Sequence, residues 1–254
     1  MRWLFVLTAA CGRLGFDPLG TPGAGGDNAD GNTAASLSPC AISATAPDPL
    51  HVQGTVLRVN FAGGMSGEAG VIVAVLDETG DIIAQTTSDP SGAYSISVST
   101  GGRPLVPRAS LAKSGLVTTV VAPDGAIDRD VVDPNTYVAQ AGALTSIYFV
   151  GGVTQNMSKG TIGVEVRDCA GAVIEGATVT MSPAPEKIVY TNNLGIPSTG
   201  QMATTGPFGL AIGLNAEPTT LTVSAAKQGL SFTAHVADVR AGSFLTDALM
   251  RPNP

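Results

Sequence analysis

Few side chains in this chain of 254 residues have the types and spacing that catalysis or metal binding requires. The two histidines, His51 and His235, lie far apart in the sequence, and a zinc site would need them to meet with further ligands. The sequence contains no nucleophile elbow, no zinc-protease motif and no phosphate-binding loop. We therefore predict a protein that is not an enzyme, with no catalytic residues, no metal site and no cofactor.

Paired acidic residues are the remaining candidates for acid–base chemistry or calcium binding. Asp77 and Asp81 form one such pair, and Asp128 and Asp130 form another. Both pairs flank predicted turns, where acidic side chains are common, so we interpret them as turn residues. The acidic and amide side chains at residues 27–30 lack the spacing and the later acidic ligand of a calcium loop.

The N-terminus has the pattern of an export signal. Arg2 precedes an apolar run at residues 3–7, and Thr8-Ala9-Ala10-Cys11 follows. The segment resembles a bacterial lipoprotein signal, in which the cysteine is lipidated and becomes the new N-terminus, although Thr8 stands where that family prefers leucine. The resemblance implies that Cys11 carries lipid and tethers an exported protein to the cell envelope, which we expect to be at the outer membrane. An ordinary cleaved signal and a start codon placed too far downstream are the alternatives.

The chain has three cysteines, so Cys40 and Cys169 remain as a candidate pair if Cys11 is lipidated. Disulfides persist in the oxidising compartments that an exported protein occupies. The alternative is two unpaired thiols, because the sequence does not show whether the two Cα atoms approach within bridging distance.

Composition favours an exported all-β protein. Only 13% of the residues are charged, against about 25% in typical soluble domains, and the chain contains 32 glycines and 17 prolines. The net charge of −7 argues against a nucleic-acid partner, because phosphate binding needs a basic surface. No apolar stretch after Cys11 is long enough to span a bilayer, so we expect membrane attachment through the N-terminal lipid alone.

The remaining chain divides into a linker and two similar segments. Residues 12–49 are rich in glycine, alanine and proline, and they predict a flexible linker after the signal at 1–11. Residues 50–152 and 158–254 each contain short alternating strands with Gly/Pro turns between them, a pattern typical of β-sandwiches. In one strand, Tyr94, Ile96 and Val98 share a face. In another, residues 161–167, the apolar side chains alternate with Glu165 and Arg167.

The segment from Asp133 to Val150 is ambiguous in its pattern. Residues 134–143 have helical spacing, and we expect a short helix or irregular crossover there, followed by a strand over Ile147 to Val150. Residues 60–70, 99–110 and 183–202 are predicted as long loops, which in sandwiches carry recognition. The last of these loops offers hydrogen-bonding side chains, and we predict a binding loop there, with a merely solvated loop as the alternative. Its candidate residues are Asn192, Asn193, Ser198, Thr199 and Gln201.

The second segment has a strand, a turn with glycine, a Gly-Ala-x-Val strand, paired threonines and an aromatic strand in this order, and the first segment shares part of the order through Gly54-Thr55-Val56 and Thr86-Thr87 to Tyr94. The second segment shows it best, at residues 164–168, 176–179 and 204–208. This order resembles the carboxypeptidase regulatory-like domain, a transthyretin-type (prealbumin-like) seven-stranded sandwich. The resemblance implies two tandem Ig-like or transthyretin-like β-sandwiches, and it brings no catalytic residues because the family has none in common.

The functional prediction is a non-catalytic binding or spacer module, anchored in the cell envelope, with a protein or polysaccharide partner. The alternatives are an accessory subunit that delivers a partner enzyme, and a calcium-dependent adhesin.

Overall fold

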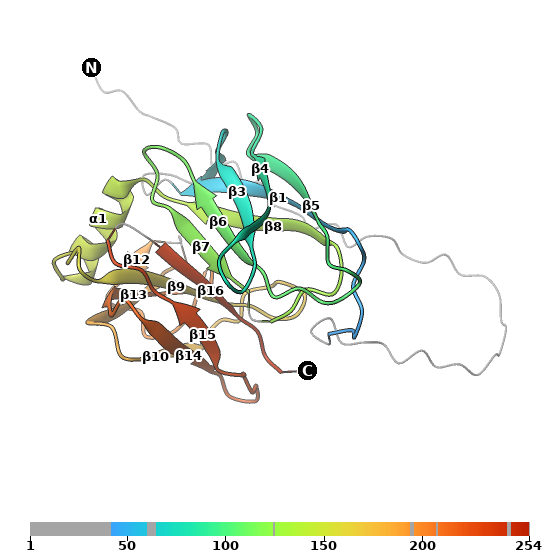
Figure 1. Cartoon of the computed structure of the whole chain (residues 1–254). Coiled ribbons are helices and arrows are strands. Elements are labelled where there is room, and N and C mark those ends of the chain that lie inside the picture. Colours follow the sequence, from blue (N-terminus) through green and yellow to red (C-terminus); the bar gives the residue numbers. More distant parts are fainter. Residues whose placement is uncertain are drawn as a thin grey trace, which may run out of the picture. The chain divides into compact units, whose positions relative to one another are not determined.

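The computed structural model describes residues 42–59, 65–123, 125–193, 196–206, 208–242 and 245–253. The predicted signal with Cys11, and Cys40 in the predicted linker, lie outside the described residues. Within this part of the chain the structure has sixteen strands and one helix (Figure 1), so the all-β prediction is confirmed.

The first of the two similar segments (residues 50–152), called the first repeat below, forms eight strands, and the second (residues 158–254) is called the second repeat. Their bounds are β1 (Leu50–Val59), β2 (Met65–Gly67), β3 (Ile72–Leu76), β4 (Ile82–Thr87), β5 (Ala93–Val98), β6 (Arg108–Ala112), β7 (Thr119–Ala122) and β8 (Val131–Val138). Helix α1 (Ala141–Gly151) follows. The second repeat contains β9 (Gly160–Val166), β10 (Thr178–Ser182), β11 (Lys187–Thr191), β12 (Pro197–Ser198), β13 (Leu210–Ala216), β14 (Thr220–Ala226), β15 (His235–Asp238) and β16 (Leu245–Met250).

Each repeat forms a sandwich around its own apolar core. In the first, β1 pairs with β2, β5 and β8, and side chains such as Val56 and Tyr94 pack against Val73 and Leu111 of the facing strands. In the second, the three-stranded sheet β10-β14-β15 packs on β9, β13 and β16. Burial of these alternating apolar faces is the main stabilising term for both repeats. The prediction of two β-sandwiches is therefore confirmed.

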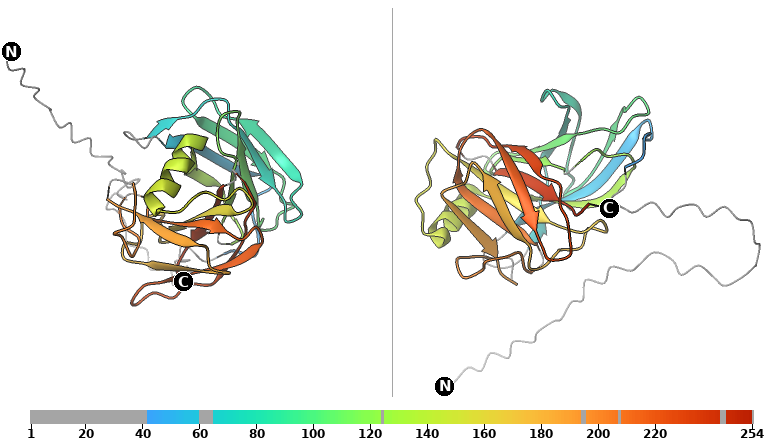
Figure 2. Two further views of the ribbon diagram at one scale, coloured as in Figure 1. Left: turned by 90° about the vertical axis from the view of Figure 1, so that its left-hand side faces the viewer. Right: turned by 90° about the horizontal axis from the view of Figure 1, so that it is seen from below.

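The two sandwiches share one sheet, which the sequence did not reveal. Its nine strands run in the order β12-β11-β13-β9-β16-β7-β6-β3-β4. The last strand, β16, pairs in parallel with β9 of the second repeat and with β7 of the first, so that Thr246 lies between Ile162 and Val120 (Figures 1 and 2). The main chain of β16 therefore hydrogen-bonds to both repeats. The predicted domain boundaries stay a prediction.

Aspartate turns connect several strands, as the sequence predicted. In the turn Asp89–Ala93, the carboxylate of Asp89 accepts hydrogen bonds from the main-chain N–H groups of Ser91 and Ala93, both within 2.9 Å. Gly92 has φ +85°, a conformation that only glycine adopts readily. Asp77 and Asp168 hold turns of the same kind.

The expected order of elements around residues 134–150 is wrong. Residues 131–138 form strand β8, which pairs in parallel with β1, and the helix comes after it. Residues 147–150 are helical because burial there follows a helical face: Ile147 and Tyr148 are buried with Leu144, whereas Phe149 is exposed. The four-residue apolar run was too short to distinguish a strand from a buried helix.

The predicted long loops are also shorter than expected. Residues 65–67 form β2, residues 108–112 include β6, and residues 183–202 contain β11 and β12. Strand β11 pairs with β13 and buries Val189 and Tyr190. These strands were not predicted because prolines and glycines, which indicate loops, dominate the composition around them.

Candidate functional site

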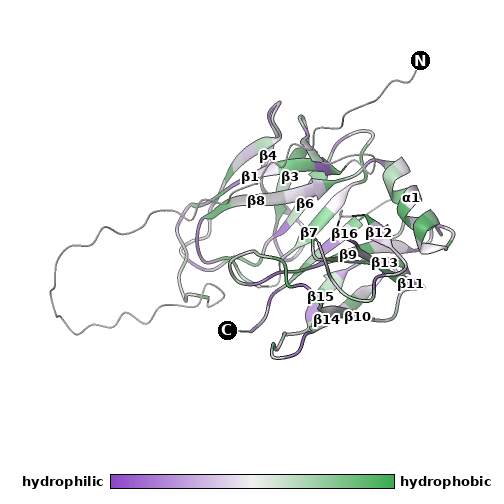
Figure 3. Cartoon of the chain, turned by 180° about the vertical axis from the view of Figure 1, so that it is seen from behind, coloured by the Kyte–Doolittle hydropathy of each residue, from purple (hydrophilic) through white to green (hydrophobic). Residues whose placement is uncertain are grey.

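A cavity lies on the face of the nine-stranded sheet that is opposite the core of the second sandwich. Its volume is about 80 Å³, and it is partly open to solvent. Helix α1 contributes Leu144 and Ile147, strand β13 contributes Leu210 and Ile212, and Leu245 comes from β16. Figure 3 shows how hydrophobic α1 is. Most of the lining is therefore apolar, as in typical small-molecule sites.

The alternation of strands β9 and β16 decides which side chains reach the cavity. On β9, Ile162 and Val164 point into the sandwich core, so Gly163 and Glu165 face the cavity. On β16, Ala248 faces the core and Asp247 faces the cavity. The register places Asp247 beside Gly163 and Leu249 beside Glu165, which brings two carboxyl groups close to each other on one face of the sheet.

One of these carboxyl groups is paired. Arg167 Nε donates to Glu165 Oε2 over 2.5 Å, and Arg167 Nη1 donates to the main-chain oxygen of Gly171 at 3.0 Å. Burial raises the pKa of Glu165 above its usual range, with the charge of Arg167 opposing the shift. Burial and the nearby charge of Glu165 also raise the pKa of the Tyr137 hydroxyl, to about 12.

The other carboxyl group has no partner. Asp247 Oδ1 is buried and makes no hydrogen bond within the described part of the chain. Burial, and then the charge of Glu165, raise the pKa of Asp247 well above its usual range. The space beside it exists because residue 163 is a glycine: a Cβ there would lie 3.4 Å from Asp247 Oδ1 and 3.3 Å from Leu210 Cδ1.

One chemistry that this arrangement can support is recognition. A buried carboxyl group can accept a hydrogen bond from a ligand that displaces solvent from the cavity. Across the described ranges, no group of three or more His, Cys, Asp or Glu side chains has the arrangement of a metal site. The aromatic edge of the cavity is formed by Tyr137 and Phe208, whose rings meet at 84° with centroids 5.4 Å apart.

Sequence reasoning missed both acidic residues of this site. The alternation placed Glu165 on the face opposite Ile162 and Val164, but alternation shows which residues share a face and not whether that face is covered. A signal does exist: Asp247 interrupts an apolar strand with one acidic residue, where a buried charge needs a reason.

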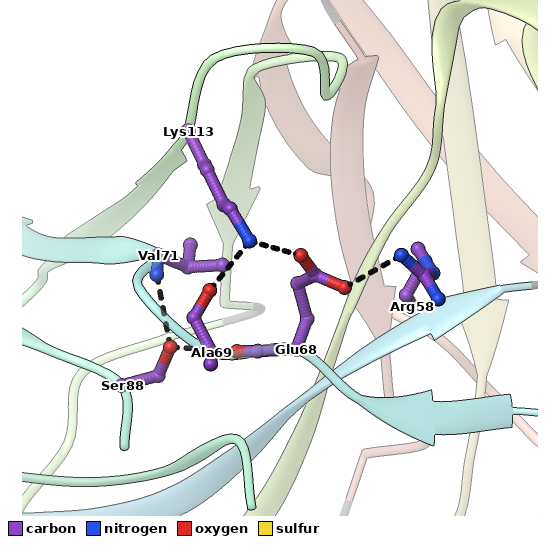
Figure 4. Close-up of polar contacts among 6 residues, drawn as sticks. All are labelled: Arg58, Glu68, Ala69, Val71, Ser88 and Lys113. Carbon is purple, nitrogen blue, oxygen red and sulfur yellow. Dashed lines mark hydrogen bonds and ion pairs between the residues drawn. The ribbon is translucent and has the colours of Figure 1, made fainter. Parts of the chain in front are cut away.

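A second polar cluster lies in the first repeat (Figure 4). The buried carboxylate of Glu68 forms ion pairs with Arg58, at 3.1 Å, and with Lys113. Lys113 Nζ also donates to the main-chain oxygen of Ala69 at 2.7 Å. The hydroxyl of Ser88 donates to the main-chain oxygen of Glu68 at 2.7 Å. These bonds fix the turn before β3 to β1 and to the residues that directly follow β4 and β6, so we assign the cluster a structural role.

The candidate binding-loop residues differ in exposure and in their hydrogen-bond partners. Asn192 Oδ1 accepts from the main-chain N–H of Ile196, and Asn193 Oδ1 accepts from Thr205 Oγ1. Ser198 lies in β12, opposite Tyr190. Thr199 is exposed and Gln201 is half-buried in the segment that follows. Several of these side chains thus serve the turn itself, and a role in binding stays a prediction.

The structure describes one of the two cysteines of the predicted disulfide. Cys169 is disulfide-bonded. Its pairing with Cys40 stays a prediction because Cys40 lies outside the described residues. In the described part of the chain, no helix is long and apolar enough to cross a membrane.

Comparisons with known proteins add little. No protein-family model and no curated protein matches the chain. The chain is similar to the Bacillus anthracis TIE protein at 11% identity and a TM-score of 0.27, over 80% of this chain and 34% of that one, about a third of its length. The shaft pilin SpaA of Lactobacillus rhamnosus GG gives 11% identity and a TM-score of 0.25, over 81% and 98% of the two chains. The minor pilin of Streptococcus agalactiae gives 9% and 0.26, over 81% and 97%. With TM-scores this low, the likenesses carry no argument about function.

Proposed function

We propose that this chain is an exported, lipid-anchored protein of the cell envelope that acts as a non-catalytic binding or spacer module. In this proposal, lipid on Cys11 holds the protein at the outer membrane, and residues 12–49 separate the membrane from two β-sandwiches. The partner is a protein or a polysaccharide. The relation to carboxypeptidase regulatory-like domains is part of the same proposal.

The shared sheet is the observation that supports this function best. Strand β16 pairs with β7 and β9, so the two repeats cannot rotate about a simple linker without breaking main-chain hydrogen bonds. A tethered module that spaces or presents a surface gains from such stiffness. Two independent sandwiches on a flexible connection would be free to move relative to each other.

Membrane fractionation with mass analysis tests the anchoring step. In a bacterial host, we expect the native chain in the membrane fraction with the added mass of lipid, and Cys11→Ser in the soluble fraction without it. Cys40→Ser is the matched control: it removes a cysteine from the same N-terminal region and should leave the chain in the membrane fraction. A Cys11→Ser chain that stays in the membranes with unchanged mass would contradict the proposal.

Three further measurements test the binding or spacer role. A pull-down from membranes should retain a protein or polysaccharide, and consistent recovery of one enzyme would favour the accessory-subunit alternative. A melting temperature that rises with calcium would favour the adhesin. Hydrolytic or transfer activity that a single side-chain change abolishes would overturn the non-catalytic assignment.

A further inference from the structure

The cavity beside Asp247 combines an apolar body with one buried, unpartnered acceptor. Such an acceptor is costly to leave unsatisfied, because buried polar atoms normally have hydrogen-bond partners. Asp247 Oδ1 has none in the described part of the chain, although it adjoins space that Gly163 leaves open. A ligand that donates a hydrogen bond there would satisfy the group and fill the cavity at once.

The volume limits the size of that ligand. One water-sized group needs about 10–15 Å³ of such space. The cavity of about 80 Å³ therefore accommodates roughly five to eight heavy atoms. Apolar side chains such as Leu144, Ile147 and Leu245 form most of its wall, so most of these atoms should be carbon.

Charge decides the nature of the donor. The two carboxyl groups that face the cavity are Glu165 and Asp247, and the guanidinium of Arg167 is already engaged by Glu165 and by the main chain at Gly171. An anionic ligand would therefore meet a carboxylate and no open cation. An ammonium group would neutralise Asp247 and form a charge-assisted hydrogen bond, which is stronger than the bond that an alcohol can offer.

We propose that this cavity binds a small primary amine, with an apolar body of about four to seven carbons in the cavity and its ammonium group donating to Asp247 Oδ1. The proposal is independent of export and of the lipid anchor. Its failure would therefore leave the membrane fractionation result unaffected, and the reverse also holds.

Binding should depend on pH in a defined direction. The titratable and charged groups around Asp247 are Glu165 and Arg167 on β9 and its end, and Tyr137 on β8. Burial and the charge of Glu165 raise the pKa of Asp247, so the free protein holds a proton there over a range above the ordinary value. The ammonium displaces that proton. Affinity should therefore rise with pH until Asp247 is ionised in the free protein, and then level off.

The test uses the full-length chain with pentylamine and its neutral analogue pentan-1-ol. Methyl resonances of Leu144, Ile147 and Leu245 report on the cavity in two-dimensional NMR titrations. We expect pentylamine to shift these resonances and to bind about tenfold more tightly than pentan-1-ol, because a hydrogen bond to a charged group is about twice as strong as a neutral one.

Substitutions separate the charge from the cavity. Asp247→Asn should weaken pentylamine binding about tenfold and change pentan-1-ol binding less than about threefold. Gly163→Ala should weaken both ligands, because its methyl group occupies the space beside Asp247. Glu78→Gln is the matched control: it removes one negative charge from an exposed turn and should leave both affinities unchanged.

Three results would overturn the proposal. The first is that neither ligand shifts the cavity resonances, and the second is that pentylamine and pentan-1-ol bind equally well. The third is that Asp247→Asn, with a cooperative unfolding transition like that of the native chain, binds pentylamine as the native chain does.

Discussion

Removal of the Glu68 carboxylate should destabilise the first repeat more than removal of an exposed carboxylate. Its side chain is 8% exposed, and it pairs with Arg58 and Lys113, whose side chains are 33% and 34% exposed. Breaking a fully buried ion pair by deleting one partner costs about 3–5 kcal/mol. Here both cations can regain water, and Lys113 keeps its bond to Ala69. We therefore expect Glu68→Ala to lower the free energy of unfolding by about 2–3 kcal/mol.

Urea unfolding at neutral pH measures this effect, as a lower midpoint with an unchanged slope. Glu217→Ala is the control, because the side chains of the Lys159–Glu217 pair are 28% and 49% exposed. An exposed pair of this kind contributes about 0–1 kcal/mol. In a Lys113→Ala background, the loss from Glu68→Ala should be smaller, since the two residues share an interaction. If Glu68→Ala costs no more than Glu217→Ala, the cluster does not stabilise the fold and the reasoning fails.

Three further predictions concern other parts of the molecule. The pKa of Asp247 is raised on folding, so the folded state binds more protons than the unfolded state, and the stability of the native chain should fall as pH rises above about 4. Asp247→Asn should be more stable than the native chain at pH 7. The free energies of unfolding of the two chains, measured by denaturation, should converge towards about pH 4. Gly92→Ala should cost well over about 1 kcal/mol of stability, because a Cβ there would lie 2.5 Å from a main-chain oxygen. Gly80→Ala has open space around the added Cβ and should cost only the backbone strain of about 1 kcal/mol. Equal losses in thermal unfolding would contradict the steric argument. Tyr190→Phe should cost about 1–3 kcal/mol, because the Tyr190 hydroxyl accepts the buried main-chain N–H of Val179 at 2.9 Å; an unchanged urea midpoint would show that another group satisfies it.

Much of the fold could be predicted from local sequence patterns. Alternation at Tyr94, Ile96 and Val98 predicted a half-buried strand, and all three are buried in β5. The turn at Asp77 to Asp81 was predicted because aspartate and glycine favour that geometry through contacts a few residues apart. These strands and turns depend on residues that are close in the sequence, so they can be inferred from the sequence alone.

The candidate site could not be predicted in the same way, because it depends on which segments meet. The pairing of β16 with both β7 and β9 joins residues far apart in the chain, and no local pattern in Leu245 to Met250 specifies two partners. The run at 147–150 is helical rather than a strand, and Ile147 and Tyr148 on its buried face pack in one apolar cluster with Leu214 and Val189. Local periodicity fixes a face, and only long-range packing decides what covers it.

The sequence by itself determined the β-rich class of this protein, its strand faces and its aspartate turns, because backbone preference and alternation act over short range. Only the tertiary structure decided that Glu165 and Asp247 line the same cavity. Each is an ordinary polar position on its own strand, and the register of β16 against β9 is what places them together. Their raised pKa values follow mainly from burial. The cavity that they line is also lined by residues of α1 and β8, which are distant in the sequence from β16.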